Sequence, residues 1–228
     1  MRRFSLAFLM VILCAGSLSA QRRQRVFTSD PDYWVSGGIA GFTGNRVNDG
    51  RSASAWEFGD AWNWQYSASL EKTVANGGTS FGVAASYARV PFTYFGPAAP
   101  IIGVPGTTCT QCDAHLDMTT LAATLHISGA TGLHTVFEFT GGIVNYANLK
   151  RDSNGAGLAG GSNTDPMFSF GWGVGYGFGD RTQIEFVPAL AIAVHERTGL
   201  ANGVGNTNRM QSFRLTLRKG FGNRSLRR

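Results

Sequence analysis

Charged side chains are scarce in this sequence. Asp, Glu, Lys and Arg together supply 15% of its 228 residues, against roughly 25% in an ordinary soluble protein. Glycine is abundant instead, with 31 residues, about twice its usual share of roughly 7%, and aromatic residues reach 12%. This composition does not suit a helical enzyme, but it suits closely packed β-strands whose faces need few charges.

A concentrated basic surface is also lacking. The formal net charge is +6, but the basic residues lie mainly near the two ends of the chain. Those at the ends of the mature chain are Arg22, Arg23, Arg25, Arg224, Arg227 and Arg228. A nucleic-acid-binding protein needs a basic face combined with stacking aromatic residues, so no nucleic-acid partner is expected.

Long apolar runs are absent after the first twenty residues. Residues 4–15 form one apolar run, preceded by Arg2 and Arg3 and followed by small residues at 17–20, which is the pattern of a secretory signal peptide. The run is too short for a membrane-spanning helix, which needs about 20 apolar residues, and no later run reaches that length. We therefore expect an exported protein without a transmembrane helix.

Cysteine is nearly absent: beyond Cys14 in the signal segment, the sequence contains only Cys109 and Cys112. An exported protein meets an oxidising compartment, so we expect these two residues to form a disulfide. His115 would extend the pair to a Cys-x-x-Cys-x-x-His metal motif, but a second ligand pair at zinc spacing is missing. Covalent haem attachment needs a histidine directly after the second cysteine, where Asp113 stands. The sequence therefore predicts a disulfide and neither a cofactor nor a metal.

Strict alternation of bulky and small residues is the clearest pattern in the sequence. Residues 62–71 place Trp62, Trp64 and Tyr66 on one face and small or polar residues on the other. Residues 168–178 alternate bulky residues with Gly or Ser in the same way. Successive side chains of a β-strand point to opposite faces, whereas a helix would distribute these residues around its circumference. Both segments are therefore predicted to be strands.

The same pattern predicts eight strands, each long enough for a tilted membrane strand of roughly 9–11 residues. They are 33–42, 62–72, 79–90, 115–127, 133–147, 166–178, 182–195 and 209–221. The connections alternate long and short, and the short ones combine Gly with Asn, Asp or Ser, which favours hairpin turns. The short connections are 75–78, 128–132 and 179–181, and the long ones are 43–61, 91–114, 148–165 and 196–208. Short periplasmic turns and long external loops are typical of outer-membrane barrels, so the predicted fold is all-β: an eight-stranded antiparallel up-and-down transmembrane β-barrel.

The organisation of the chain follows from these segments. It is a cleaved signal peptide at 1–20, a periplasmic N-terminal segment at 21–31, the transmembrane β-barrel at 32–221 and a basic C-terminal tail at 222–228. An even number of strands leaves both ends of the barrel on the periplasmic side.

The bulky face of each strand is predicted to face lipid. An eight-stranded barrel is just wide enough for its own side chains, so residues such as Trp64, Phe170 and Trp172 would overfill it, whereas glycine and serine fit. A soluble secreted barrel or sandwich shows the same alternation and is the alternative. Aromatic residues near strand ends are expected to form interfacial girdles. These residues are Tyr33, Trp34, Trp62, Tyr87, Tyr146 and Phe221.

Two segments resemble a known family. Residues 168–186, with a Gly-x-Gly-x-Gly strand, a Gly-Asp-Arg turn and a Gln-Ile-Glu-Phe strand, resemble the bacterial outer-membrane β-barrel domain family, which includes the small OmpA/OmpX-like and OmpW-like barrels. Residues 213–221 resemble the last strand that such proteins present to the barrel-insertion machinery. The resemblance implies the outer membrane of a diderm bacterium, with that machinery and outer-membrane lipid, including lipopolysaccharide, as partners. The family usually ends at the terminal aromatic residue, whereas residues 222–228 follow here, so the insertion signal would be read internally or less efficiently.

Four charged residues are predicted to point into the barrel. In the last two strands the bulky residues face lipid, so Glu185, Arg214 and Arg218 point inward, and the same rule places Glu138 inward. Their positions along the strands put Glu185 and Arg218 at matching heights near the periplasmic end, with Glu138 and Arg214 farther up. Because a lone buried charge is costly, we expect an ion-pair cluster that plugs and orders the barrel; a proton or ligand path is the alternative.

Two histidines raise the alternative of a lipid acyl hydrolase or transferase. His126 and Ser128 form a His-x-Ser pair similar to that of outer-membrane lipid A deacylases, and residues two apart on a strand share a face. However, His126 precedes a short periplasmic turn, whereas lipid A occupies the outer leaflet. His195 and Glu196 lie near the external end, without an evident serine neighbour. No catalytic residue is therefore predicted.

Three functional classes remain, in descending order. The first is a structural or surface-interaction barrel whose long loops contact an extracellular partner. The second is a narrow pore or a conduit for small hydrophobic ligands, which the filled interior of an eight-stranded barrel disfavours. The third is the lipid-modifying enzyme.

Overall fold

The computed structural model describes residues 31–59, 62–75, 78–97, 99, 102, 108–129, 131–160 and 162–223. The expected signal peptide at 1–20, residues 21–30 of the N-terminal segment and residues 224–228 of the tail lie outside this part of the chain. Within the described ranges, no helix is long and apolar enough to cross a membrane.

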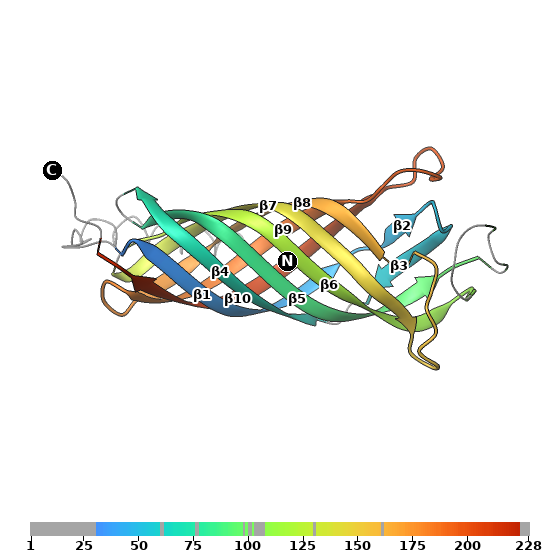
Figure 1. The fold of residues 1–228 in the computed structure, drawn as a ribbon, viewed down its shortest axis with the longest axis horizontal. Helices are drawn as coiled ribbons and strands as arrows, with labels where there is room; N and C mark the ends of the chain where they lie inside the picture. The colour runs from blue at the N-terminus through green and yellow to red at the C-terminus, as the bar shows by residue number, and fades with distance from the viewer. Residues whose placement is uncertain are drawn as a thin grey trace, which may run out of the picture.

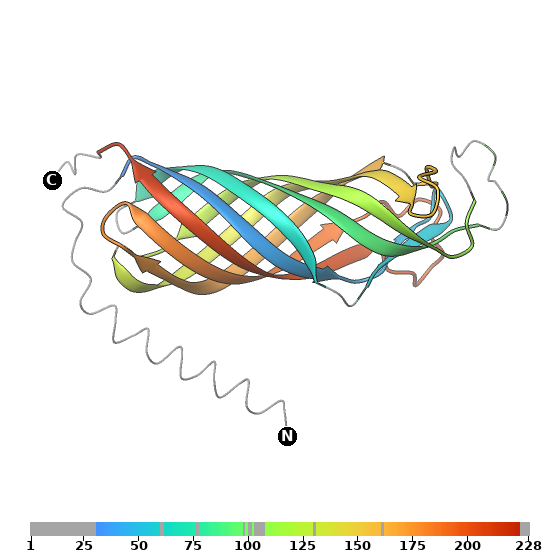
Figure 2. The same ribbon diagram turned by 90° about the horizontal axis from the view of Figure 1, so that it is seen from below.

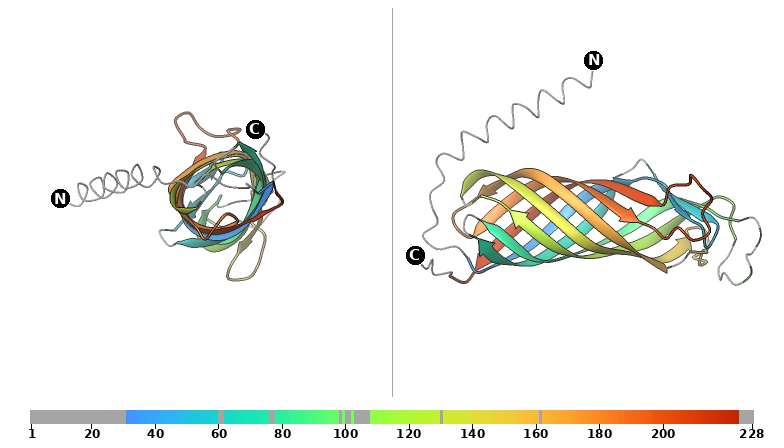
Figure 3. Two further views of the ribbon diagram at one scale, coloured as in Figure 1. Left: turned by 90° about the vertical axis from the view of Figure 1, so that its left-hand side faces the viewer. Right: turned by 90° about the horizontal axis from the view of Figure 1, so that it is seen from above.

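Eight long antiparallel strands form a closed barrel (Figure 1). They are β1 (Tyr33–Gly44), β4 (Asn63–Ala75), β5 (Thr79–Phe95), β6 (Cys112–Ile127), β7 (Gly132–Arg151), β8 (Ser162–Gly177), β9 (Thr182–Val194) and β10 (Thr207–Phe221). Each pairs with the next long strand along the chain, and β10 also pairs with β1, which closes the wall. The end-on view in Figure 3 shows the resulting ring. The predicted eight-stranded antiparallel barrel is confirmed.

Side chains alternate between the outer surface and the lumen along every long strand. Large apolar residues such as Phe186, Leu190 and Leu215 are exposed on the outside, whereas Val187 and Thr216, which lie between such residues, are buried inside. The lumen of so narrow a barrel holds mainly small side chains. The prediction that the bulky face points outward is therefore confirmed.

Each of the three short connections contains or ends at a glycine in the left-handed region. Gly78, Gly132 and Gly179 have φ angles of 90°, 70° and 103°, which residues with a Cβ rarely adopt. All three turns lie at the end of the barrel where β1 begins and β10 ends, and the long loops lie at the opposite end (Figure 2). These two ends are called the short-turn end and the long-loop end below.

Four strands extend at least three residues farther toward the long-loop end than the alternation predicted. Their far ends are at Phe95 of β5, Cys112 of β6, Arg151 of β7 and Ser162 of β8. The expected limits fell short because the pattern changes in this region. Outward side chains such as Arg89 and Asp117 are polar there, while inward side chains such as Val90 and Leu116 remain apolar and buried. The strands therefore continue beyond the last apolar outward residue.

The first long loop, expected at 43–61, contains a hairpin of two short strands, β2 (Val47–Asp49) and β3 (Ser54–Phe58). β3 pairs antiparallel with the far end of β5, so the hairpin extends the barrel wall at the long-loop end (Figure 1). Short strands without a repeated alternation gave no signal for this hairpin in the sequence.

A hydrophobic core fills the lumen at the long-loop end. Its larger members are Phe42, Val47, Trp56, Phe58, Val90, Phe92, Tyr94, Leu116, Met118, Val144, Tyr146 and Leu149. Trp56 of the hairpin is fully buried and packs edge-on against Tyr146, with ring centroids 5.4 Å apart. The hairpin therefore contributes both wall and filling to this end of the barrel.

Two of the residues assigned to the interfacial girdles face the lumen instead. Trp34 and Tyr146 are buried, whereas the other four are exposed as expected. Adjacent residues of a strand point to opposite sides, so Tyr33 and Trp34 cannot both face outward. Tyr146 lies two residues from the buried Val144 and shares its inward face. The girdle prediction was wrong at these two positions because it used nearness to a strand end without the face rule.

Candidate functional site

Arg218 is the centre of a charge cluster in the lumen at the short-turn end. Its guanidinium lies 2.6 Å from Glu71 Oε2 and 3.4 Å from Glu185 Oε1. It also donates hydrogen bonds to Ser80 Oγ at 2.9 Å and to Gln183 Oε1 at 3.2 Å. The side chain is only 1% exposed. Since these partners come from β4, β5 and β9, Arg218 of β10 ties four strands together across the lumen.

Trp34 of β1 covers the guanidinium of Arg218. The Cζ atom of Arg218 lies 4.7 Å from the centroid of the tryptophan ring, which is a cation–π geometry. Trp34 is buried, and β1 begins at Tyr33, so the ring lies at the short-turn end. It shields the ion pairs of Arg218 from water on that side.

His126 connects this first group to a second ion pair. Its Nε2 atom lies 3.1 Å from Glu185 Oε1, and its Nδ1 atom lies 3.6 Å from Glu138 Oε2. Glu138 in turn accepts a hydrogen bond of 2.5 Å from Arg214 Nη2. The lumen therefore holds one continuous network of charged side chains rather than two separate pairs.

All four charged residues that the face rule placed inside lie in this network. Glu185 and Arg218 are in contact, but diagonally, because Glu185 is registered opposite Thr216 and not opposite Arg218. Sequence reasoning missed Glu71 as the nearest carboxylate of Arg218 and missed His126 as the link. The face rule that placed the four predicted charges inside also applies to Glu71 and His126. Each of these two residues lies on the inward face of a strand whose outward face carries apolar residues.

The His126–Ser128 pair does not form a nucleophile and base in this geometry. Both ring nitrogens of His126 face carboxylates. Ser128 Oγ instead donates to the Gly129 carbonyl at 3.5 Å and accepts from Arg218 Nη1 at 3.4 Å. A serine nucleophile needs the base within hydrogen-bond reach, and here each side chain is engaged by other partners.

A small cavity separates the charge cluster from the hydrophobic core. Its volume is about 90 Å³, enough for a few water molecules. The lining consists mainly of serine, threonine and alanine, with three methionines on the walls. Those methionines are Met118, Met167 and Met210, and Arg214 also lines the cavity. A second cavity of about 20 Å³, room for about one water, lies within the charge cluster.

A second polar cluster lies at the long-loop end, centred on His195. His195 Nδ1 lies 2.9 Å from Asp165 Oδ2, and Nε2 lies 3.8 Å from Asp49 Oδ1 of β2. Trp56 of β3 packs edge-on against the imidazole, with centroids 5.4 Å apart. Asp49 also accepts a hydrogen bond of 2.6 Å from Ser52 Oγ. The cluster fastens the β2–β3 hairpin to the barrel wall.

The electrostatics of this second cluster favour a charged pair. Burial would lower the pKa of His195, but the hydrogen bonds and negative charges of Asp165 and Asp49 outweigh it and raise this pKa to about 9. Burial would likewise raise the pKa of Asp49, but hydrogen bonds from His195, Ser52 and the Arg51 amide lower it to about 2. At neutral pH an imidazolium therefore bridges two carboxylates. His195, singled out beside Glu196 in the sequence, is held as a structural bridge.

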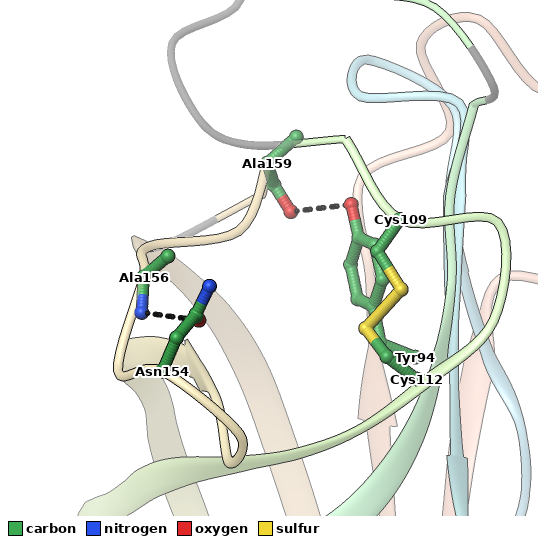
Figure 4. Close-up of a disulfide and its surroundings, with 6 residues drawn as sticks. All are labelled: Tyr94, Cys109, Cys112, Asn154, Ala156 and Ala159. Atoms are coloured by element: carbon green, nitrogen blue, oxygen red, sulfur yellow. Dashed lines mark hydrogen bonds between the residues drawn. A yellow bond between two sulfur atoms is a disulfide. The ribbon is translucent and has the colours of Figure 1, made fainter.

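Cys109 and Cys112 form a disulfide where the second long loop meets β6 (Figure 4). Tyr94 lies opposite Cys112 in the β5–β6 pairing and donates a hydrogen bond of 3.1 Å to the Ala159 carbonyl. The disulfide thus lies next to a contact between the far end of β5 and the third long loop. Its ring spans only a few residues, so it stiffens the loop base rather than joining distant strands.

His115 is engaged on the outer wall, away from the cysteines. Its Nδ1 atom lies 2.5 Å from Asp152 Oδ1, and its Nε2 atom lies 2.6 Å from Arg89 Nη2. The Cys-x-x-Cys-x-x-His metal motif considered above is therefore not assembled. Across the described ranges, no group of three His, Cys, Asp or Glu side chains is arranged to hold a metal ion.

Comparison with known proteins gives structural but not sequence neighbours. No family model and no curated protein sequence matches the chain. The barrel superimposes on Neisserial surface protein A with a TM-score of 0.51 at 12% identity, covering 83% of this chain and 97% of that one. The Ail protein of Yersinia pestis, solved with the heparin analogue sucrose octasulfate, gives a TM-score of 0.46 at 10% identity and covers 84% of this chain and 99% of that one.

The N-terminal barrel domain of Pseudomonas aeruginosa OprF gives a TM-score of 0.38 at 14% identity, covering 84% of this chain and 99% of that domain. At 12% identity, the likeness to Neisserial surface protein A concerns the fold alone. Strand number, antiparallel order and closure through the first and last strands agree with it. The chain has the eight-stranded fold of the small OmpA/OmpX-like outer-membrane β-barrels.

Proposed function

We propose that the protein spans the outer membrane of a diderm bacterium, with the long-loop end outside the cell. Along β9 the exposed apolar residues run from Ile184 to Val194. At about 3.3 Å per residue and a strand tilt of about 40°, this gives an apolar band about 25 Å tall, the height found in outer-membrane barrels. The exposed Phe221 at the end of β10 supports recognition of this strand by the barrel-insertion machinery.

We propose further that the protein acts through its external surface, as a non-catalytic interaction barrel. The observation that carries this proposal is that the lumen is filled at both ends. The charge network around Arg218 occupies the short-turn end, and the core around Trp56 occupies the long-loop end. A barrel filled in this way leaves no wide aqueous path, so the surface at the long-loop end is the part available to partners.

The extension at the long-loop end supports a binding role. Strands β5 to β7 continue past the apolar band. The β2–β3 hairpin is fixed to β5 by strand pairing, and to β8 and the end of β9 by the His195 cluster. The first and fourth long loops meet in an exposed ion pair between Arg51 and Glu196, with a distance of 3.3 Å. Such a preorganised platform lowers the ordering cost of binding a partner.

The proposed lipid partner in the outer leaflet is lipopolysaccharide. Arg89 on β5 and Lys150 on β7 are exposed on the outer wall beyond the apolar band. Cations at this height face the anionic groups of the outer leaflet, where each contributes about 1 kcal/mol to lipid binding. This contact would anchor the platform at the membrane surface.

The proposal is tested with a variant that keeps the barrel but lacks the fourth long loop. Residues 196–206 are replaced by a short Gly-containing turn, and heat-modifiable migration shows that the barrel still folds. We expect the wild-type protein to increase adhesion of the expressing cells to matrix or to other cells, and we expect the loop variant to lose this effect. The matched control is the substitution Lys72→Gln, which changes an exposed charge at the short-turn end.

Two further measurements distinguish this proposal from a pore and from a lipid-modifying enzyme. Planar bilayers with the wild-type protein should show no stepwise conductance; stable conductance would favour a pore. Mass spectrometry of lipids from cells with and without the protein should show the same acyl composition; a changed composition would favour an enzyme.

A further inference from the structure

An apolar groove lies on the lipid-facing wall where the first and last strands meet. Its sides are formed by Ile39 of β1, Ile184 of β9, and Leu215 and Leu217 of β10, and Gly37 forms its floor. A Cβ atom built on Gly37 would meet nothing within 4 Å. The missing side chain therefore leaves open space on the outer surface at this point.

Two exposed lysines lie just beyond the groove, toward the short-turn end. The strand pairing aligns Leu217 of β10 with Gly37 on one side and with Ile184 on the other. The next outward-facing residue of β10 toward the short-turn end is Lys219. Lys72 on β4 is paired with Tyr33 of β1, which lies two residues closer to the short-turn end than Val35, the partner of Lys219. Both lysines are exposed on the outer face.

The spacing of the two lysines suits one shared anion. Their Cα atoms are separated by two strand spacings and two residues, or about 12 Å, and both carry a long flexible stem with a strongly hydrated charge. Lys219 Nζ donates to Thr182 Oγ1 of β9 at 2.9 Å, so its flexible side chain has to turn from β9 toward β1 to share an anion with Lys72. The exposed Tyr33 ring stands between the two lysines, as aromatic residues do at a membrane interface.

We infer that this groove binds an anionic glycerophospholipid of the periplasmic leaflet. One acyl chain lies in the groove over Gly37, and the phosphate lies between Lys72 and Lys219. The inference rests on the proposed orientation in the outer membrane, because that orientation puts the short-turn end at the phospholipid leaflet. An apolar channel in the lipid-facing wall that ends at two cations matches such a lipid in both shape and charge.

The test is native mass spectrometry of the folded protein in detergent micelles, titrated with phosphatidylglycerol. The double variant Lys72→Gln/Lys219→Gln should bind about 30-fold more weakly. The variant Gly37→Leu, which fills the groove, should bind about tenfold more weakly. Phosphatidylethanolamine, with no net charge, should bind more weakly than phosphatidylglycerol to the wild-type protein.

Matched controls come from the same surface. Ala123→Leu enlarges an exposed residue on β6, and Arg209→Gln removes an exposed cation at the long-loop end of β10; both should bind as the wild-type protein does. Gly37→Ala serves as a milder variant if Gly37→Leu does not fold. Equal phosphatidylglycerol binding by the wild-type protein and all folded variants would overturn the inference. It would also be overturned if the wild-type protein formed a dimer through the groove and Gly37→Leu disrupted that dimer without changing lipid binding.

The inference and the proposed location fail in distinguishable ways. If the wild-type barrel inserts into vesicles with its long loops accessible, but the lysine substitutions do not change lipid binding, only the lipid site is overturned. A wild-type protein that does not enter vesicles and stays soluble without detergent overturns the location as well.

Discussion

Replacing Arg218 should strongly destabilise the barrel. The guanidinium is fully buried and pairs with Glu71 and Glu185, at 2.6 and 3.4 Å. Removing one partner of a buried ion pair typically costs about 3–5 kcal/mol, because the remaining charge is left uncompensated in a medium of low dielectric constant. Here two carboxylates lose their partner, and Trp34 loses a cation–π contact worth about 1–2 kcal/mol. We expect Arg218→Ala to lower the free energy of unfolding by about 4 kcal/mol or more.

The substitution Arg218→Met separates charge from packing. It keeps a long side chain against Trp34 but removes the charge, so it should still cost about 3 kcal/mol. Adding Glu71→Gln removes part of the uncompensated negative charge, and the double variant should recover part of that loss. Lys150→Met, which neutralises an exposed charge, is the control and should change stability by less than about 0.5 kcal/mol.

The measurement is urea unfolding of the protein in lipid vesicles, followed by tryptophan fluorescence and by heat-modifiable migration. An unchanged slope of the unfolding free energy with urea assigns a shifted midpoint to stability. A loss below about 1 kcal/mol for Arg218→Met, or a double variant less stable than Arg218→Met, would refute the reasoning that the buried ion pairs order the short-turn end.

Three further predictions concern the long-loop end. Because Asp165 and Asp49 raise the pKa of His195 from 6.5 to about 9, the stability from these two pairings is full below pH 6.5 and is lost as the pH rises through about 9. Subtilisin should therefore cut the β2–β3 hairpin faster at pH 10 than at pH 7, and His195→Gln should remove most of this difference. Replacing Cys109 and Cys112 together with serine should keep the heat-modifiable band, since a short disulfide ring adds little to a closed barrel; loss of the band would contradict this. Protease added to intact cells should cut within 196–206 and spare the short turns, and the opposite result would invert the topology.

The strands and their faces could be predicted because the barrel imposes one rule on every strand. A narrow lumen admits small side chains and a lipid-facing wall requires bulky apolar ones, so alternation is visible wherever both conditions hold. The rule fails at the long-loop end, where Arg89 and His115 replace apolar residues on the outside. The strands continue there because their inner face still packs into the core.

The partners within the charge network depend on geometry that a single strand does not encode. Glu138, Glu185, Arg214 and Arg218 were placed inside by the face rule alone. Which carboxylate lies nearest Arg218 depends on how far the strands are staggered when the barrel closes, and Glu71 lies across the β1–β10 and β1–β4 pairings from it. Stagger is a property of the closed sheet, so the contact at 2.6 Å could not be read from spacing.

That dependence on closure gives the two ends of the lumen different roles in assembly. Strands β5 to β8 pair with their chain neighbours, so much of the wall around the hydrophobic core forms from local hairpins. The network of Arg218 instead joins β10 to β4 and to Trp34 of β1, and these contacts exist only after the first and last strands have paired. The Glu71–Arg218 ion pair therefore forms only in the closed barrel. In an open sheet Arg218 would keep only Glu185 of the neighbouring strand β9, and Glu71 would lose its cation in a lipid environment at high cost. This penalty on the open form favours closure of the seam between β1 and β10.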